Sequence, residues 1–166
     1  MRDASNATLV VKDSTGQQFI YKPTAGERPL WDFPTGTLAQ RERAAYVLSE
    51  LLGWHVVPET SLVDGPHGIG SLQQWLDAEV TAVDVMAPGT VPSGWMSVFE
   101  GVGPDNKPVV LVHRDDHELL RIAVFDVVIN NADRKGGHIL TDSAERHYAI
   151  DHGVTFHTEP KLRTVL

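Results

Sequence analysis

The sequence predicts an α+β fold with two lobes around a cleft. β-rich runs, one helical segment and further β-rich runs come first, and a second helical segment with a small hairpin comes last. Strands and helices therefore follow each other in blocks, without the regular alternation that builds a parallel sheet. The chain has 166 residues, enough for one domain with a sizeable core. We expect residues 1–76 to form a small β-rich N-terminal lobe, residues 77–107 an irregular connection and residues 108–166 the second lobe.

The first lobe begins with an expected hairpin. Residues 7–12 and 17–22 are rich in β-forming side chains, and turn-forming residues separate them. Residues 23–36 contain three prolines and two glycines, so we expect a loop there. The remaining expected elements of this lobe are a helix capped by Thr37 and running to about Leu52, a strand at 54–63, a turn at 64–70 and a strand at 71–76.

The second half of the sequence gives weaker indications of secondary structure. Residues 78–107 have a mixed composition, several prolines and no clear periodicity, which favours a loop or an insertion. Residues 109–112 are a short strand candidate. Asp115 or Asp116 is expected to cap a strongly apolar helix that runs to about Ile129. A polar, glycine-bearing loop then leads to a small hairpin with strands at 138–140 and 147–150.

Composition and charge exclude several classes of function. The 14 Lys and Arg residues and 22 Asp and Glu residues give a net charge of −8, so neither nucleic acid nor an anionic membrane surface is an expected partner. The chain has no cysteine, which excludes disulfides, thiolate zinc sites and cysteine nucleophiles. The N-terminal residues lack the apolar core of a signal peptide, and no run approaches the ~18 apolar residues of a membrane span. We therefore expect a cytoplasmic protein without integral membrane association.

Four charged residues lie in an order that fits phosphoryl transfer from ATP. Lys22 ends the second strand, Glu42 lies on the following helix, Asp133 lies in the loop after the second helix, and Asp151 follows a strand. This chemistry uses a strand lysine to neutralise phosphates and a helix glutamate to hold that lysine. It also uses one aspartate to orient and deprotonate the acceptor hydroxyl and another to hold the metal. Positioning and charge neutralisation provide nearly all of the catalysis, so these residue types predict a phosphotransferase.

Three motifs resemble those of one kinase family. Residues 5–13, followed by Gly16 and Ile20-Tyr21-Lys22-Pro23, are similar to the nucleotide-binding start of the type II phosphatidylinositol 4-kinases and their bacterial relatives. Asn130-Asn131-Ala132-Asp133-Arg134 resembles the N-x-D-R catalytic loop that this group shares with the HipA-type toxin kinases. Ala149-Ile150-Asp151-His152-Gly153 resembles its I-D-x-G metal motif. The resemblance to the phosphatidylinositol 3-/4-kinase-like family covers most of the chain, and residues 26–33 and 161–166 look like an uncharacterised actinobacterial branch of it.

The resemblance implies a bilobal protein-kinase-like fold with a helical C-terminal lobe, and it implies ATP with Mg²⁺ or Mn²⁺ as cofactors. By this resemblance Asp133 is the catalytic aspartate, Lys22 the phosphate-binding lysine and Asp151 the metal ligand. The γ-phosphate would go to a hydroxyl of a lipid (phosphoinositide-like), a protein or a small molecule, and the sequence does not choose among these acceptors. The further expected nucleotide-binding residues are Ser5 and Asn6 in the first motif, Gln74 and Trp75 near the adenine hinge, and Glu42, which is assigned from its helix position.

Two features depart from the pattern of this family. A metal-binding asparagine usually follows the catalytic aspartate by five residues, and His138 stands at that position here. Because imidazole is a softer ligand than an amide oxygen, a site with His138 and Asp151 would hold Mg²⁺ less well and tolerate Mn²⁺ better. The chain also ends fifteen residues after Asp151, so we expect a C-terminal lobe that is either truncated or minimal.

Two alternatives stay open at the level of the sequence. The first is a non-catalytic, nucleotide-binding pseudokinase, because a fold does not fix a function. The second is a metal-dependent hydrolase, because His113 and His117 are four residues apart and His147, His152 and His157 lie close to Asp151 in sequence. The hydrolase has less support, since the chain contains no H-E-x-x-H motif and no standard zinc-site spacing.

Overall fold

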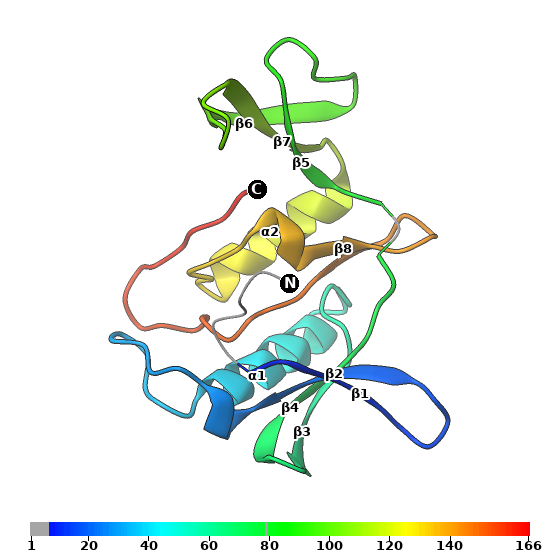
Figure 1. Ribbon diagram of the computed structural model, residues 1–166, viewed down its shortest axis with the longest axis vertical. Coiled ribbons are helices and arrows are strands. Elements are labelled where there is room, and N and C mark those ends of the chain that lie inside the picture. The colour runs from blue at the N-terminus through cyan, green and yellow to red at the C-terminus, as the bar shows by residue number, and fades with distance from the viewer. Residues whose placement is uncertain (1–6, 79) are drawn as a thin grey trace.

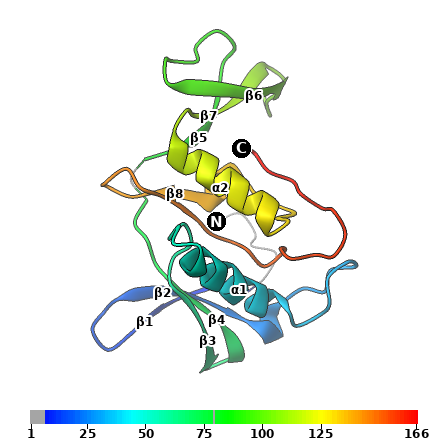
Figure 2. The same ribbon diagram turned by 180° about the vertical axis from the view of Figure 1, so that it is seen from behind.

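The computed structural model describes residues 7–78 and 80–166 and confirms the α+β class. In Figure 1 a four-stranded sheet with one helix forms one end of the molecule, and a three-stranded sheet forms the other. The second helix and a two-stranded hairpin lie between these ends, as the view from behind also shows (Figure 2). The elements of the described residues are β1 (Leu9–Lys12), β2 (Gln18–Pro23), η1 (Thr24–Gly26), α1 (Leu38–Leu51), β3 (Thr60–Gly65), β4 (Gly68–Gln74), β5 (Val83–Met86), β6 (Trp95–Val102), β7 (Pro108–Arg114), α2 (His117–Val128), η2 (Gly136–His138), β8 (Ile139–Thr141) and β9 (His147–Ala149).

The four-stranded sheet has the order β1-β2-β4-β3, and all of its neighbouring strands are antiparallel. The expected β1–β2 hairpin is confirmed, and Asp13 shapes its turn by accepting the backbone N–H groups of Thr15 and Gln17 at 2.8 and 3.0 Å. β3 and β4 differ from the prediction, because the turn between them is short and both strands continue into residues 64–70. β2 is an inner strand, and Lys22 pairs with Ser71 on β4. Lys22 lies one residue beyond the part of β2 that pairs with β1, so β4 alone flanks it at this position.

Helix α1 packs against β3 and β4. It begins after Thr37, as expected, but the Thr37 hydroxyl donates to the carbonyl of Pro34 at 2.7 Å and does not cap a helix N–H group. The buried face of α1 includes Leu38, Ala45 and the carboxylate-bearing Glu42. A buried carboxylate is stable only when it has hydrogen-bond partners, and for Glu42 these are the Lys22 ammonium and the backbone N–H of His152.

Residues 77–107 do not form the irregular connection that the sequence predicted. They contain β5 and β6, which pair with β7 on its two sides. Side chains of β6 are exposed at nearly every position, and a register shift lies between Ser97 and Phe99. Its sequence therefore lacks the apolar–polar alternation that identifies a half-buried strand. The second half is also less helical than expected, since the described residues after 77 contain one α-helix and five strands.

Helix α2 lies at the centre of the core and contributes more residues to it than any other element. Asp116 is its N-cap and accepts the backbone N–H of Leu119 at 2.8 Å, which settles the choice between Asp115 and Asp116. The helix is apolar but short, and none of the helices in residues 7–78 and 80–166 could span a lipid bilayer. The core cluster combines buried residues of α2, of α1, of the segment that precedes β3 and of the β8–β9 hairpin. Among them are Leu119, Ile122, Phe125, Ala45, Val56, Val57, Ile139 and Ala149.

Candidate functional site

A cavity of about 520 Å³ lies where β2 and α1 face the loops that follow α2 and β9. Lys22 comes from β2, Glu42 from α1, Asp133 and His138 from the chain after α2, and Asp151 from the segment after β9. These five residues were expected at the site, and all of them line this one cavity although Lys22 and Asp151 are 129 positions apart. Other lining residues are Ala7, Thr8, Pro23, Glu27, Arg28, Leu30, Leu38, Ala39, Ser71, Lys135, Gly153 and Val154.

Lys22 lies between two carboxylates. Its Nζ atom is 2.6 Å from Oε1 of Glu42 and 3.2 Å from Oδ1 of Asp151. Burial by itself would lower the pKa of Lys22, but the charges of Glu42 and then Asp151 outweigh it and the pKa is raised. Lys22 is therefore a fixed cation at neutral pH, held by residues from two different parts of the chain.

Asp151 connects Lys22 to His138. Its Oδ1 atom accepts from Lys22, and its Oδ2 atom lies 3.2 Å from Nε2 of His138. Burial would raise the pKa of Asp151, but the positive charge of Lys22 and, after it, the interaction with His138 lower it to about 2. The backbone of Asp151 has a φ of 62°, in the left-handed region, which is uncommon for a non-glycine residue although aspartate adopts it more readily than most. The contacts of its side chain with Lys22 and His138 help to hold it in this conformation.

His138 adds an unusual nitrogen atom to the cavity. Burial, more than the neighbouring charges, lowers its pKa, so the ring is neutral at pH 7. Its Nδ1 atom is buried and has no hydrogen-bond partner among the described residues. The nitrogen beside the Asp151 carboxylate is Nε2, and a neutral imidazole nitrogen next to a carboxylate is a pair of donors that suits a divalent cation of intermediate softness.

Asp133 lines the same cavity but has different neighbours. Its Oδ1 atom is 2.6 Å from Nη2 of Arg163, and its Oδ2 atom is 2.7 Å from Nζ of Lys135. Burial would raise its pKa, but hydrogen bonds from Lys135 and Arg163 lower it. The side chain of Asn131 orients the loop by accepting the backbone N–H of Asp133 at 3.0 Å. Asp133 is therefore an ionised carboxylate whose two oxygens face exposed cations.

A buried ion pair fixes the loop that carries Asp133. The guanidinium of Arg134 binds Asp126 of α2 through three contacts of 2.9 to 3.2 Å, and both side chains are fully buried. Arg134 also donates to the carbonyl of Ile150 at 2.6 Å. Sequence reasoning missed the role of Asp126, although a lone acidic residue in an apolar helix is a signal for a buried partner.

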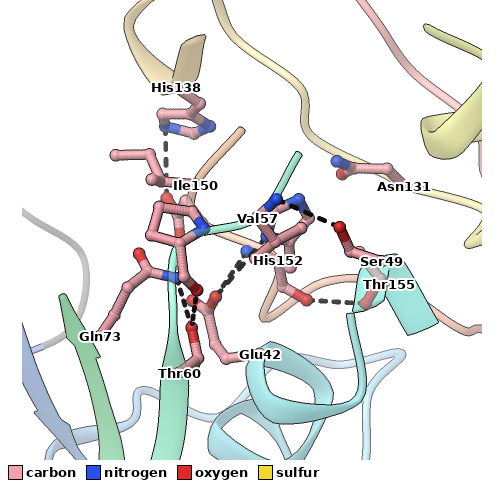
Figure 3. A network of polar contacts seen from close by, with 12 residues as sticks. Glu42, Ser49, Val57, Thr60, Gln73, Asn131, His138, Ile150, His152 and Thr155 are labelled. Carbon is pink, nitrogen blue, oxygen red and sulfur yellow. Dashed lines mark hydrogen bonds and ion pairs between the residues drawn. The ribbon is translucent and has the colours of Figure 1, made fainter. Parts of the chain in front are cut away.

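His152 is a second residue that sequence reasoning did not place at the site. Figure 3 shows its side chain beside Glu42, with the Glu42 carboxylate reaching from α1 to the His152 backbone. The imidazole is fully buried, and Nε2 lies 2.9 Å from Nη2 of Arg134. Nothing in the sequence beyond its place next to Asp151 indicates this contact.

Some expected residues are not brought to the cavity. Gln74 and Trp75 lie at the end of β4 and do not line it, and the indole N–H of Trp75 donates to Asp77 at 2.8 Å. Their place near an adenine hinge stays a prediction. Ser5 and Asn6 lie outside the described residues, so their predicted contact with phosphates also stays a prediction.

The histidines that suggested a hydrolase are dispersed. His113 lies on β7 and His117 begins α2, so the two do not share a helix face. Within residues 7–78 and 80–166, no group of three or more His, Asp or Glu side chains is arranged to hold a metal ion. The C-terminal histidines each have a separate partner, namely Asp116 for His147, Arg134 for His152 and the carbonyl of Asp32 for His157.

Comparison with known proteins gives two relatives. The chain is 48% identical over 180 residues to "Protein Rv2133c" of Mycobacterium tuberculosis, an alignment that covers all of this chain and 65% of that protein. It is 26% identical over 191 residues to "Phosphatidylinositol 4-kinase gamma 2" of Arabidopsis thaliana, which covers 91% of this chain and 32% of the plant protein. The chain therefore spans less than two thirds of the length of either relative. No protein-family model matches it, and no solved structure matches it.

The second relative bears on the expected family. This relative is named as a phosphatidylinositol 4-kinase, and the similarity extends over nearly the whole of this chain at a low identity. A distant similarity to a phosphatidylinositol kinase is thus established. The narrower resemblance to type II enzymes and to HipA-type kinases stays a prediction.

Proposed function

We propose that this chain is an ATP-dependent phosphotransferase that moves the γ-phosphate of ATP to a hydroxyl group. The observation that carries the proposal is the contact of Lys22 with both Glu42 and Asp151 in a cavity that Asp133 also lines. A lysine held by a helix glutamate, beside two separated aspartates, is the arrangement that phosphoryl transfer uses. The distant similarity to a phosphatidylinositol 4-kinase supports the same reaction class.

Lys22 would bind the phosphates of ATP. Its ammonium group is a permanent cation, and Glu42, which is almost fully buried, fixes its direction through the 2.6 Å contact. An incoming phosphate would replace the weaker, 3.2 Å contact with Asp151. Asp151 would then be free to act as a ligand, while Glu42 keeps the lysine in place.

Asp151 and His138 would hold the divalent cation. One carboxylate and one neutral imidazole nitrogen are too few ligands by themselves, so phosphate oxygens and water would complete the shell. The bound cation would neutralise charge on the β- and γ-phosphates during transfer. Because His138 offers nitrogen where an asparagine would offer oxygen, we expect Mn²⁺ to support binding better than Mg²⁺.

Asp133 would accept the proton of the acceptor hydroxyl. As the hydroxyl oxygen bonds to the γ-phosphorus, the bond to the β–γ bridging oxygen breaks, ADP leaves and the hydroxyl proton passes to Asp133. Lys135 or Arg163 must move away from one carboxylate oxygen to admit the hydroxyl, and both side chains are exposed enough to do so. The acceptor class, whether a lipid (phosphoinositide-like), a protein or a small molecule, is left to experiment.

One observation favours a second candidate, a nucleotide-binding pseudokinase. Both oxygens of Asp133 are occupied by cations, and this pairing lowers the basicity that a proton acceptor needs. A pseudokinase would bind ATP at Lys22 and transfer nothing.

The experiment is a transfer assay with γ-labelled ATP and Mn²⁺ or Mg²⁺, offering phosphatidylinositol vesicles, a mixed protein substrate and a set of polyols in separate reactions. We expect label on one acceptor class, loss of transfer in Asp133→Asn with ATP binding retained, and no change in Asp105→Asn, whose carboxylate lies in the distant β6–β7 turn. ATP binding without transfer to any acceptor would instead support the pseudokinase. Transfer that survives both Asp133→Asn and Asp151→Asn would contradict the assignment of the site.

A further inference from the structure

The ring of His152 has a defined protonation state. Its Nε2 atom is 2.9 Å from Nη2 of Arg134, and a guanidinium can only donate hydrogen bonds. Nε2 is therefore the acceptor, and the single ring proton lies on Nδ1, which has no hydrogen-bond partner among the described residues. Burial lowers the pKa of His152 well below its usual value, in agreement with a neutral ring.

The backbone of His152 contacts Glu42, the residue that holds Lys22. Its N–H donates to Oε2 of Glu42 at 2.9 Å, while Oε1 of the same carboxylate holds Lys22 (Figure 3 shows Glu42 and His152). The carbonyl of His152 accepts the Thr155 hydroxyl at 2.7 Å. Ring and backbone together connect the lysine–glutamate pair to Arg134 and, through it, to Asp126 of α2.

These contacts fix the peptide groups on both sides of Asp151. The carbonyl of Ile150, which precedes Asp151, accepts from Arg134 at 2.6 Å. The N–H of His152, which follows it, donates to Glu42. Asp151 is held between them with its positive φ of 62°, in the left-handed region that non-glycine residues adopt uncommonly.

We infer that His152 is a positioning residue for Asp151. Its ring accepts a hydrogen bond from Arg134 and its backbone N–H donates one to Glu42, and together these bonds keep Asp151 in its left-handed conformation and aimed into the cavity. The inference rests on the proposed function, in which Asp151 holds the cation bound with ATP. Loss of such a supporting contact reduces the affinity of a metal site by about 10- to 100-fold. His152 touches neither substrate nor cation in this account and acts only through its neighbours.

Two variants and a control test the inference. His152→Leu keeps a similar size but removes the ring acceptor, whereas in His152→Gln the side-chain oxygen can still accept from Arg134. His147→Leu is the matched control, because His147 is also a buried histidine but lies outside the cavity. Its two ring nitrogens contact Asp116 and Thr141. ATP affinity of each protein is measured with Mn²⁺ and with EDTA, together with its melting temperature.

We expect His152→Leu to lose the metal-dependent part of the ATP affinity selectively. In His152→Leu the gain in ATP affinity that Mn²⁺ provides should fall by about 10- to 100-fold, while affinity in EDTA stays close to that of the unaltered chain. His152→Gln should recover most of the gain. His147→Leu should lower the melting temperature and leave the gain unchanged. A folded His152→Leu that keeps the full gain, or a His152→Gln that is as weak as His152→Leu, would overturn the inference and leave the proposed function standing.

If His152→Leu does not fold, a spectroscopic measurement on the unaltered chain tests the inference instead. Long-range ¹H–¹⁵N spectra of the unaltered chain, with His152→Gln used to assign the signal, should show a protonated Nδ1 and a bare Nε2 for this ring. A proton on Nε2 would overturn the inference, because the ring could then not accept from Arg134. A chain with this ring state that binds no ATP under any condition would contradict the proposed function instead.

Discussion

The two aspartates of the cavity are held in different ways. Asp151 contacts Lys22, a half-buried lysine that Glu42 fixes, and the peptide groups on either side of Asp151 are bonded to Arg134 and Glu42. Asp133 contacts Lys135 and Arg163, which are largely exposed. The side chain of Asp151 is itself half exposed, but the residues that it contacts are buried or half-buried and are fixed by other contacts, whereas the partners of Asp133 are exposed side chains.

This difference matches two requirements of the proposed reaction. Charge neutralisation at the phosphates is most effective when the groups are fixed before ATP arrives, because no reorganisation is then needed. An acceptor must enter and leave, and the exposed partners of Asp133 can move to admit it. The predictions below test this contrast, from the largest expected effect to the smallest.

Removing one partner of the buried Arg134–Asp126 pair should have the largest effect. Asp126→Ala leaves a guanidinium without its counter-charge in a fully buried position, and we expect it to lower the free energy of unfolding by about 3–5 kcal/mol. Urea unfolding followed by circular dichroism gives this value. A loss below about 1 kcal/mol would show that the pair does not anchor the loop.

Replacing Lys22 should affect the reaction more than the fold. Lys22→Met removes the cation that would stabilise charge on the phosphates, and we expect a fall of about 100- to 1000-fold in the rate of transfer. Lys12→Met is the control, because Lys12 lies on the neighbouring strand β1 and does not line the cavity. Equal rates of transfer in Lys22→Met and Lys12→Met would show that Lys22 does not take part in the reaction.

Acid should destabilise the Asp151 side of the cavity. The folded pKa of Asp151 is lowered from 3.8 to about 2, so its ionised form stabilises the folded state above pH 4, and this contribution is lost as the pH falls from about 4 to 2. We expect the unaltered chain to lose more stability than Asp151→Asn over this interval. Urea unfolding at several pH values measures both. Parallel curves would indicate that Lys22 does not interact with Asp151 in solution.

The exposed partners of Asp133 should contribute least to stability. Arg163→Gln and Lys135→Gln each break a surface pair, and we expect each to change the free energy of unfolding by less than about 1 kcal/mol, and by less still at high salt. Unfolding in low and high salt tests this. A loss as large as that of Asp126→Ala would remove the contrast between the two aspartates.

The sequence predicted the parts of the fold that have local signals. Turn residues around Asp13, the N-cap Asp116 and helical spacing in α1 and α2 each depend on neighbours in the chain, and all are confirmed. Strands β5 and β6 were missed because β6 is exposed at most positions and so shows no alternation. Its strand character comes from pairing with β7, which the local sequence does not reveal.

The candidate site could be predicted only in part for the same reason. Lys22, Glu42, Asp133, His138 and Asp151 were chosen from residue type, order and resemblance, and they line one cavity. The supporting contacts of Arg134 with Asp126 and His152 depend on how α2, the loop after it and the segment after β9 pack together. The acidic Asp126 in an apolar helix indicates a buried partner, but the sequence does not say which residue that partner is. Residue type thus predicted the groups that face the cavity, whereas the groups that hold them required the structure.

The most direct test of the account is calorimetric titration of the chain with ATP in Mg²⁺, in Mn²⁺ and in EDTA, repeated with Asp151→Ala. We expect ATP binding that the metal strengthens, more with Mn²⁺ than with Mg²⁺, and a loss of this metal-dependent part of the affinity in Asp151→Ala. Binding that is equal in metal and EDTA, or no binding by a folded chain under any of the three conditions, would contradict it.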